Sequence, residues 1–158
     1  MNRPITLLYP RPWGEAMRCA HLMAGRLARE GHHVLAVDVG RYLASHLLAD
    51  QVVLICLEGG GERQPEAVLD FLDYVQALEP GDLYGLCYSV FSLGDGPKPN
   101  SGGQELDFLL KHLGGTRIVT HIRCPADFAE GFAIWSDAVS DILAFDRALR
   151  LSPIPMEL

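Results

Sequence analysis

The sequence predicts an α/β fold: a three-layer, doubly wound parallel sheet of five strands in the order 2-1-3-4-5, with helices on both faces. Two observations support this fold class. Short apolar runs alternate along the chain with segments whose apolar residues recur at helical spacing, which is typical of strands that alternate with helices. The apolar run at residues 84–93 ends in a Gly-Asp loop, and open α/β sheets present their ligand loops at the carboxyl ends of strands.

The first half of the chain supplies three of the expected strands. The apolar run at residues 5–9 lies between Pro4 and Pro10, which indicates a buried strand. Residues 14–30 carry apolar side chains at helical spacing, and Gly31 is expected to end that helix. The remaining elements of this half are a second strand at 33–39, a short helix at 42–48 and a strongly apolar third strand at 51–57.

The second half repeats the alternation. The glycines at 59–61 break the third strand, and residues 65–78 form an amphipathic pattern that predicts a helix. Pro153 and Pro155 mark a loose tail over residues 151–158, so we expect a single domain over residues 1–150. The other elements expected here are strands at 84–93 and 116–122 and helices at 104–113 and 128–149.

Composition restricts the possible partners. The formal net charge of −7 argues against nucleic acid as a main partner and suits docking on a basic protein surface, although solubility alone also explains it. No apolar run reaches the ~20 residues that span a membrane, and no secretory signal follows the start. Four cysteines lie far apart without a C-x-x-C pair, which disfavours a zinc site and indicates a cytoplasmic protein with reduced thiols; they are Cys19, Cys56, Cys87 and Cys124.

Three loops are expected to meet at the carboxyl edge of the sheet, over residues 10–15, 57–65 and 92–102. The third loop, after Ser92, runs Leu93-Gly94-Asp95, and the helix after it closes on Gly114-Gly115. These segments resemble the third cofactor loop and following helix of the flavodoxin-like family, in particular short-chain flavodoxins and the FMN-binding domains of diflavin reductases. The resemblance extends from Ile5 to about Ala144 and implies an FMN-carrying electron-transfer protein.

The first loop departs from the family's phosphate-binding pattern. Arg11, Trp13 and Glu15 stand where the family usually places hydroxyl side chains, and only Gly14 keeps the pattern. Arg11 is a possible charge-assisted donor to a phosphate, whereas Glu15 is expected in the first helical turn, where it would repel one. Trp13 is either a replacement aromatic cover for the flavin or a packing residue, and a helix capped by its own glutamate without a ligand remains an alternative.

The other two loops keep glycines and lose aromatic side chains. The second loop retains Gly59, Gly60 and Gly61, but Glu58 replaces an aromatic residue that often covers one flavin face. The third loop continues with Gly96 where the family usually has a serine and then a tyrosine. Since an aromatic contact contributes up to about 1.5 kcal/mol beyond area burial, the resemblance implies a weakened FMN site. Its candidate residues are Arg11, Trp13, Gly14, Glu58, Gly59, Gly60, Gly61, Leu93, Gly94, Asp95 and Gly96.

Two functions follow from this combination. One is FMN-dependent electron transfer to or from a redox partner, such as an NAD(P)H-dependent reductase or an acceptor; in that role the chain is an electron carrier and not a stand-alone enzyme. The alternative is a pseudo-flavodoxin that has lost FMN and acts as a binding or regulatory module. A cysteine phosphatase is disfavoured because Cys56 and Arg63 are one residue too far apart, and the histidine spacing disfavours a metal site.

Overall fold

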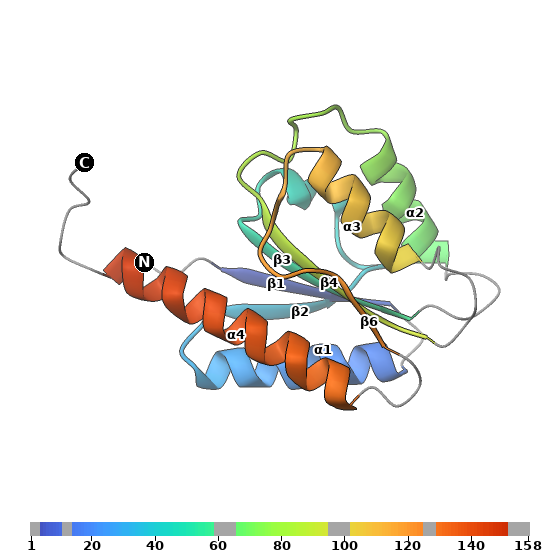
Figure 1. Ribbon diagram of the computed structural model, residues 1–158. Coiled ribbons are helices and arrows are strands. Elements are labelled where there is room, and N and C mark those ends of the chain that lie inside the picture. Colours follow the sequence, from blue (N-terminus) through green and yellow to red (C-terminus); the bar gives the residue numbers. More distant parts are fainter. Residues whose placement is uncertain (1–3, 11–13, 59–65, 95–101, 125–128, 152–158) are drawn as a thin grey trace.

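The computed structural model describes residues 4–10, 14–58, 66–94, 102–124 and 129–151. Its strands form one parallel sheet with helices on both faces (Figure 1). The strands are β1 (Ile5–Tyr9), β2 (Val34–Asp38), β3 (Val52–Glu58), β4 (Cys87–Leu93), β5 (Thr116–Arg117) and β6 (Ile122–Cys124). The helices are α1 (Glu15–Arg29), the 3-10 helix η1 (Ala44–Leu48), α2 (Glu66–Gln76), α3 (Gly102–His112) and α4 (Ala129–Leu151).

The predicted strand order is confirmed, with one difference at the edge. The sheet runs β2-β1-β3-β4-β5, and every pair is parallel. The expected fifth strand is divided into β5 and β6, which pair with the two ends of β4. Between them, the Ser89 hydroxyl of β4 donates to the Val119 carbonyl at 3.0 Å and accepts from the Trp135 indole at 2.8 Å. The Ser89 hydroxyl thus pairs the Val119 carbonyl, which a continuous fifth strand would pair with a backbone amide.

Two cores lie on opposite faces of the sheet. Helices α1 and α4 cover one face, and α2, α3 and η1 cover the other (Figure 1). Trp135 of α4 is fully buried against Phe91 of β4, with ring centroids 5.2 Å apart. On the other face, Tyr88 of β4 is fully buried and its hydroxyl donates to the Asp107 carbonyl of α3. The helices are therefore fixed to the central strands by aromatic side chains that alternate in direction along β4.

Most element boundaries agree with the sequence to within a few residues. Gly31 follows α1 with φ +94°, a conformation in which glycine carries no steric penalty. The strand expected from residue 84 begins only at Cys87, because Gly85 has φ +97° and Tyr84 is 89% exposed in the preceding turn. Helix α4 continues to Leu151, the first residue of the expected tail; residues 152–158 lie outside the described part.

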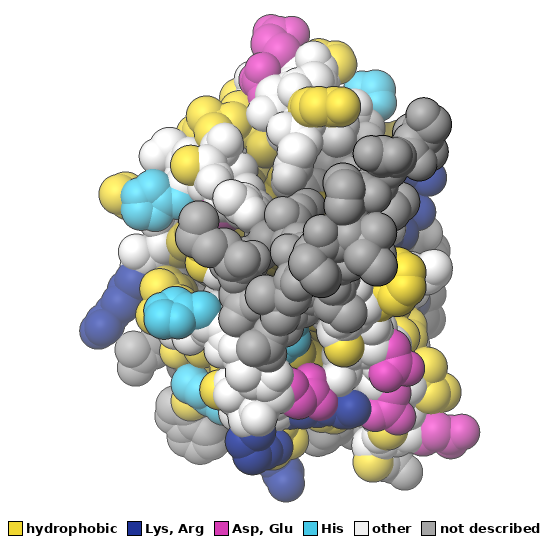
Figure 2. All heavy atoms as spheres, turned by 90° about the vertical axis from the view of Figure 1, so that its left-hand side faces the viewer, with side chains coloured by type: hydrophobic (Ala, Val, Ile, Leu, Met, Phe, Trp, Pro, Cys, Tyr) yellow, Lys and Arg dark blue, Asp and Glu magenta, His cyan; other side chains and the backbone are white. Residues whose placement is uncertain are grey.

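The strand register sets the geometry of the carboxyl edge. Glu58, the last residue of β3, pairs laterally with Leu93, the last residue of β4. The Gly94 amide then donates to the Cys124 carbonyl of β6 at 2.8 Å. The ends of three neighbouring strands are thereby brought level. Figure 2 looks onto the opposite, amino edge, where acidic and basic side chains are interspersed. Among the described helices, none is long and apolar enough to cross a bilayer.

Candidate functional site

The N-terminus of α1 is capped by the carboxylate of Glu58, the last residue of β3. Glu58 Oε1 accepts a hydrogen bond from the Ala16 amide at 2.8 Å, 42 residues away in sequence. Gly14, the residue before the helix, is extended and provides no side-chain cap. A Cβ on Gly14 would overlap Glu58 Oε1, so glycine at this position makes the contact possible. The first turn of a helix has free amides and a positive dipole end, which is an anion-binding environment that Glu58 fills.

Glu15 lies in the first turn of α1, as predicted. Its side chain is 54% exposed, and its carboxylate lies 3.7 Å from Arg18 in the same helix. An exposed pair of this kind contributes little to stability. The carboxylate that accepts from an amide of this turn is that of Glu58, which in the sequence replaces an aromatic residue that often covers one flavin face.

At the end of β4, the side chains of Ser92 and His121 form a hydrogen-bonded neutral pair. The Ser92 side chain is fully buried and lies 2.6 Å from His121 Nε2 in the segment between β5 and β6. Gly103 of α3 packs on this pair, and a Cβ there would overlap the Ser92 hydroxyl. Burial lowers the pKa of His121, and the cations of Arg117 and Arg123 lower it further, against the opposing effect of Asp107. The imidazole is therefore neutral at pH 7 and forms a hydrogen bond without a net charge.

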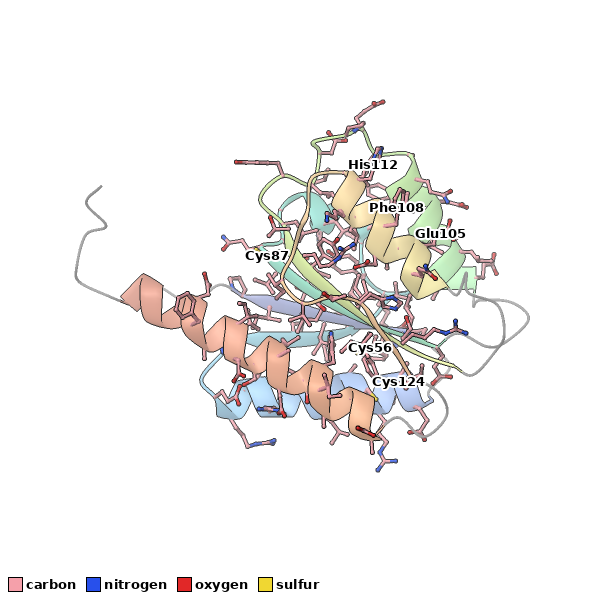
Figure 3. The ribbon with its side chains drawn as sticks, in the orientation of Figure 1. Cys56, Cys87, Glu105, Phe108, His112 and Cys124 are labelled. Atoms are coloured by element: carbon pink, nitrogen blue, oxygen red, sulfur yellow. The ribbon has the colours of Figure 1, made fainter. Side chains whose placement is uncertain are left out.

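Three buried thiols lie beneath the carboxyl edge. Figure 3 labels Cys56 and Cys124 on the α1 and α4 side of the sheet; Cys87 packs against the same core but lies at the start of β4, at the amino end of the sheet. Burial, with Glu15 next, raises the pKa of Cys19 to about 12, and burial raises the pKa values of Cys56 and Cys124. Protonated thiols are poor nucleophiles and poor metal ligands. Among the described residues, no group of three or more His, Cys, Asp or Glu side chains is arranged to hold a metal.

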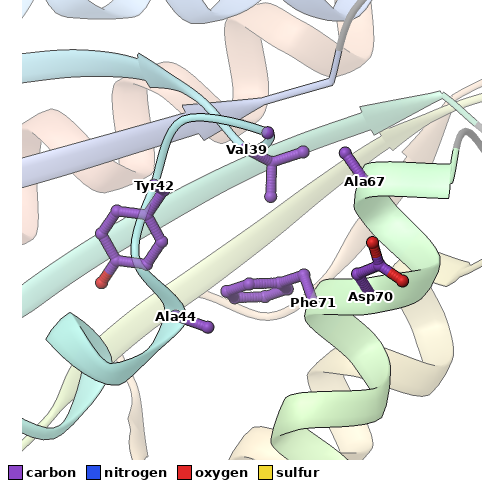
Figure 4. Close-up of a pocket in the computed structure, with 7 residues that line it drawn as sticks. Val39, Tyr42, Ala44, Ala67, Asp70 and Phe71 are labelled. Atoms are coloured by element: carbon purple, nitrogen blue, oxygen red, sulfur yellow. The ribbon is translucent and has the colours of Figure 1, made fainter.

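Two small cavities lie apart from the Glu58 and Ser92 contacts. One, of ≈ 160 Å³, lies between the end of β2, η1 and α2 (Figure 4); it is lined by Val39, Gly40, Tyr42, Ala44, Ala67, Asp70 and Phe71. The other, of ≈ 230 Å³, is at the amino edge against α4; it is lined by Val52, Cys87, Ile118, Ile142, Leu143, Phe145 and Asp146. Both are smaller than the roughly 300–1,000 Å³ of pockets for drug-sized ligands.

The structure brings the described candidate residues together. Gly14, Glu58, Leu93 and Gly94 all lie at the carboxyl edge, where Glu58 touches the start of α1 and pairs with Leu93. The other candidates, Arg11, Trp13, Gly59, Gly60, Gly61, Asp95 and Gly96, lie outside the described residues. Sequence reasoning missed Ser92, His121 and Gly103. Only Ser92 carried a signal, because a hydroxyl within an apolar strand needs a partner.

The comparisons identify the class of protein that this fold and edge define. The family model described as "Flavodoxin" matches residues 8–135. The chain therefore belongs to the flavodoxin family, which confirms the resemblance seen in its loops.

Several relatives and solved structures agree with this membership. The chain is 28% identical over 142 residues to the sulfite reductase [NADPH] flavoprotein alpha-component of Bacillus subtilis (strain 168), covering 88% of this chain and 24% of the relative. It is 23% identical to the protein of that name from Shewanella sp. (strain MR-4), covering 87% of this chain and 24% of that one. The chain thus spans about a quarter of the length of these curated relatives.

Solved flavodoxins share the fold at low identity. A short-chain flavodoxin associated with a non-canonical PDU bacterial microcompartment matches with a TM-score of 0.77, 19% identity, and coverage of 91% of this chain and 98% of that one. A flavodoxin of Streptococcus pneumonia TIGR4 matches with a TM-score of 0.75, 17% identity, and coverage of 90% and 99%. The family and these relatives support FMN-type electron transfer in general.

The family typically binds FMN, and the residues at the start of α1 suit its phosphate end. The start of α1 suits an anion, because helix-terminal amides converge there and the Glu58 carboxylate already lies on one of them as a stand-in anion. Gly14 leaves room that a Cβ would fill. These features fit the phosphate end of FMN, with Glu58 as the group that must give way.

Proposed function

We propose that this chain is an FMN-dependent electron-transfer protein with a weakened cofactor site. The observation that carries the proposal is the meeting of α1, β3 and β4 at one edge of the sheet, in a chain of the flavodoxin family. FMN, when bound, supplies reversible electron uptake and release. The chain would act in the cytoplasm as a carrier and not as a stand-alone enzyme. Its partner would be an NAD(P)H-dependent reductase or an acceptor.

Each part of the edge has a proposed task. The amides at the start of α1, with Gly14 and Arg11, hold the phosphate. Leu93 and Gly94, with the loops at 59–61 and 95–96, lie against the flavin, and Trp13 covers part of it. The Ser92 and His121 pair keeps the end of β4 in place and excludes water from beneath it. Since the pair is neutral and part-buried, its role is to position the loop backbone.

A second function is favoured by the Glu58 contact. Because the chain's own carboxylate satisfies the Ala16 amide, the fold needs no ligand at this helix end. The chain would then be a pseudo-flavodoxin that has lost FMN and serves as a binding or regulatory module in an electron-transfer system.

Flavin content separates the two functions. The full chain is purified, its visible absorption is recorded, and FMN is titrated while quenching of flavin fluorescence is followed. FMN-dependent electron transfer predicts saturable binding, weaker than in flavodoxins with intact aromatic covers, and reversible reduction of the bound flavin. Absence of saturable binding would contradict this function and support the pseudo-flavodoxin.

A further inference from the structure

We infer that Glu58 is a specificity-determining residue of this site: its carboxylate takes the anion position at the start of α1 in the flavin-free chain and so selects against the phosphate of a flavin. The inference rests on the proposed function, since it concerns how that site treats its cofactor. It differs from the weakening expected from the sequence, which came from missing aromatic and hydroxyl side chains and from Glu15.

The contact is built into the fold and is not a local helix cap. Glu58 ends β3 and reaches the Ala16 amide of α1 at 2.8 Å. The lateral pairing of Glu58 with Leu93 fixes the backbone from which the side chain extends. Gly14 provides the space for the carboxylate, because a Cβ there would overlap Oε1. Strand register, helix position and a glycine therefore all place one carboxylate on one helix end.

Charge makes this arrangement selective. A carboxylate at a helix N-terminus is stabilised by the dipole and by charge-assisted hydrogen bonds to the amides. A phosphate monoester would need the same donors, and two anions cannot share one Ala16 amide. The first turn already carries Glu15, whose charge is partly countered by Arg18 at 3.7 Å. A phosphate must therefore displace Glu58, and the displaced carboxylate remains on the neighbouring strand end as a repelling charge.

The consequence is a difference between two flavins that share one ring system. FMN and riboflavin differ only in the phosphate, so ring contacts affect both alike. The Glu58 carboxylate penalises the binding of FMN and leaves riboflavin unaffected. Removing its charge should raise the affinity for FMN alone, and the gain should shrink at higher salt because partly exposed charges are screened.

The test titrates FMN and riboflavin against the full chain and three variants. Glu58→Gln keeps an oxygen acceptor and removes the charge, while Glu58→Ala removes both. Glu130→Gln, an exposed first-turn acid of α4, is the control with the same change in net charge. We expect Glu58→Gln to bind FMN about tenfold more tightly than wild type at low salt, with unchanged riboflavin affinity. Glu130→Gln should match wild type with both flavins.

Melting temperature of the flavin-free proteins gives a second readout. Glu58→Ala should melt below wild type because the Ala16 amide loses its partner, whereas Glu58→Gln should lie between them. Equal FMN affinity for wild type and Glu58→Gln would overturn the inference and leave FMN-dependent transfer standing. Equal gains for FMN and riboflavin would also overturn it, since the effect would then lie with the ring. Failure of every variant to bind either flavin would overturn both the inference and the proposed function.

Discussion

The two halves of the carboxyl edge are held together by different chemistry. Where α1 meets β3, the charged Glu58 carboxylate lies on the Ala16 amide at 2.8 Å. Where β4 meets α3, the neutral pair of Ser92 and His121 is joined at 2.6 Å beneath Gly103. An anion on helix amides can be exchanged for another anion, whereas a part-buried neutral pair around a fully buried hydroxyl has no such substitute. We therefore expect a ligand to exchange at the α1 half, while the β4 half acts as a fixed support.

The largest effect is expected from filling the fixed half. Gly103→Ala places a Cβ onto the Ser92 hydroxyl and near His121. Overpacking of this kind lowers the free energy of unfolding by roughly 1–3 kcal/mol, and we expect the upper part of that range. Chemical denaturation checks this. Ser92→Gly in the same chain removes the overlapping hydroxyl and should recover part of the loss.

Gly25→Ala is the matched control for this substitution. Gly25 is inside α1, and the nearest atom to an added Cβ is the flexible end of Arg29 at 3.3 Å. Replacing a helical glycine with alanine should stabilise the protein by about 0.5–1 kcal/mol. If both variants were equally stable, Gly103 would not be in close contact with the β4 half, and that half could not be called fixed.

The next effect concerns the neutral pair itself. His121→Ala leaves the buried Ser92 hydroxyl without the imidazole that partners it, which should lower the free energy of unfolding by about 1–2 kcal/mol at pH 7. Denaturant midpoints of wild type and variant measure the difference. A loss well below this range would mean that Ser92 finds another partner and that the pair does not support the loop.

The free energy of unfolding should depend on pH through His121, in a direction that its lowered pKa fixes. Burial lowers the folded-state pKa of His121, with Arg117 and Arg123 acting in the same direction and Asp107 opposing them. The unfolded state therefore binds a proton more readily than the folded state, so stability falls as pH drops from about 6.5 through the lowered pKa. His121→Gln should remove this contribution, so the free energy of unfolding of the variant should fall less steeply below about pH 6.5 than that of wild type. Parallel pH profiles would contradict a lowered pKa for the His121 imidazole in the folded state.

Much of the fold was predictable because its strands and helix ends depend on short-range patterns in the sequence. The apolar runs at 5–9 and 51–57 and the glycine at 31 give β1, β3 and the end of α1 directly. The division of the fifth strand was not predictable, since it depends on Ser89 contacting Val119 and Trp135, 30 and 46 residues away. Such contacts follow from packing and leave no periodicity in the sequence.

The site was predictable in position but not in chemistry. Strand order alone places Gly14, Glu58 and Leu93 at one edge. The sequence also placed Glu15 in the first helical turn, and it lies there. The sequence could not predict which carboxylate accepts from the Ala16 amide. The contact between Glu58 and Ala16 depends on strand register and on the space at Gly14.

A smaller effect separates the two acids of the α1 half by stability. Glu58→Ala removes an acceptor from a helix-terminal amide and should lower the free energy of unfolding by about 1 kcal/mol. Glu15→Gln removes one partner of an exposed pair with Arg18 and should change it by less than about 0.5 kcal/mol. Thermal unfolding of both variants without flavin checks the order. A reversed order would assign the cap of α1 to Glu15.

The smallest effect is expected from Glu15→Thr on FMN affinity. The substitution restores a hydroxyl of the family type and removes a negative charge from the first turn, so affinity should rise. The gain should be under about threefold, because the Glu15 carboxylate is exposed to solvent and partly neutralised by Arg18 at 3.7 Å. The measurement is the FMN dissociation constant at low and moderate salt, beside Glu58→Gln. A gain from Glu15→Thr that equals or exceeds that of Glu58→Gln would mean that the exposed acid, and not the strand-borne one, controls access of a phosphate to α1. Weaker binding than wild type would show that the start of α1 does not receive a phosphate, and the pseudo-flavodoxin would then be the better account of this edge.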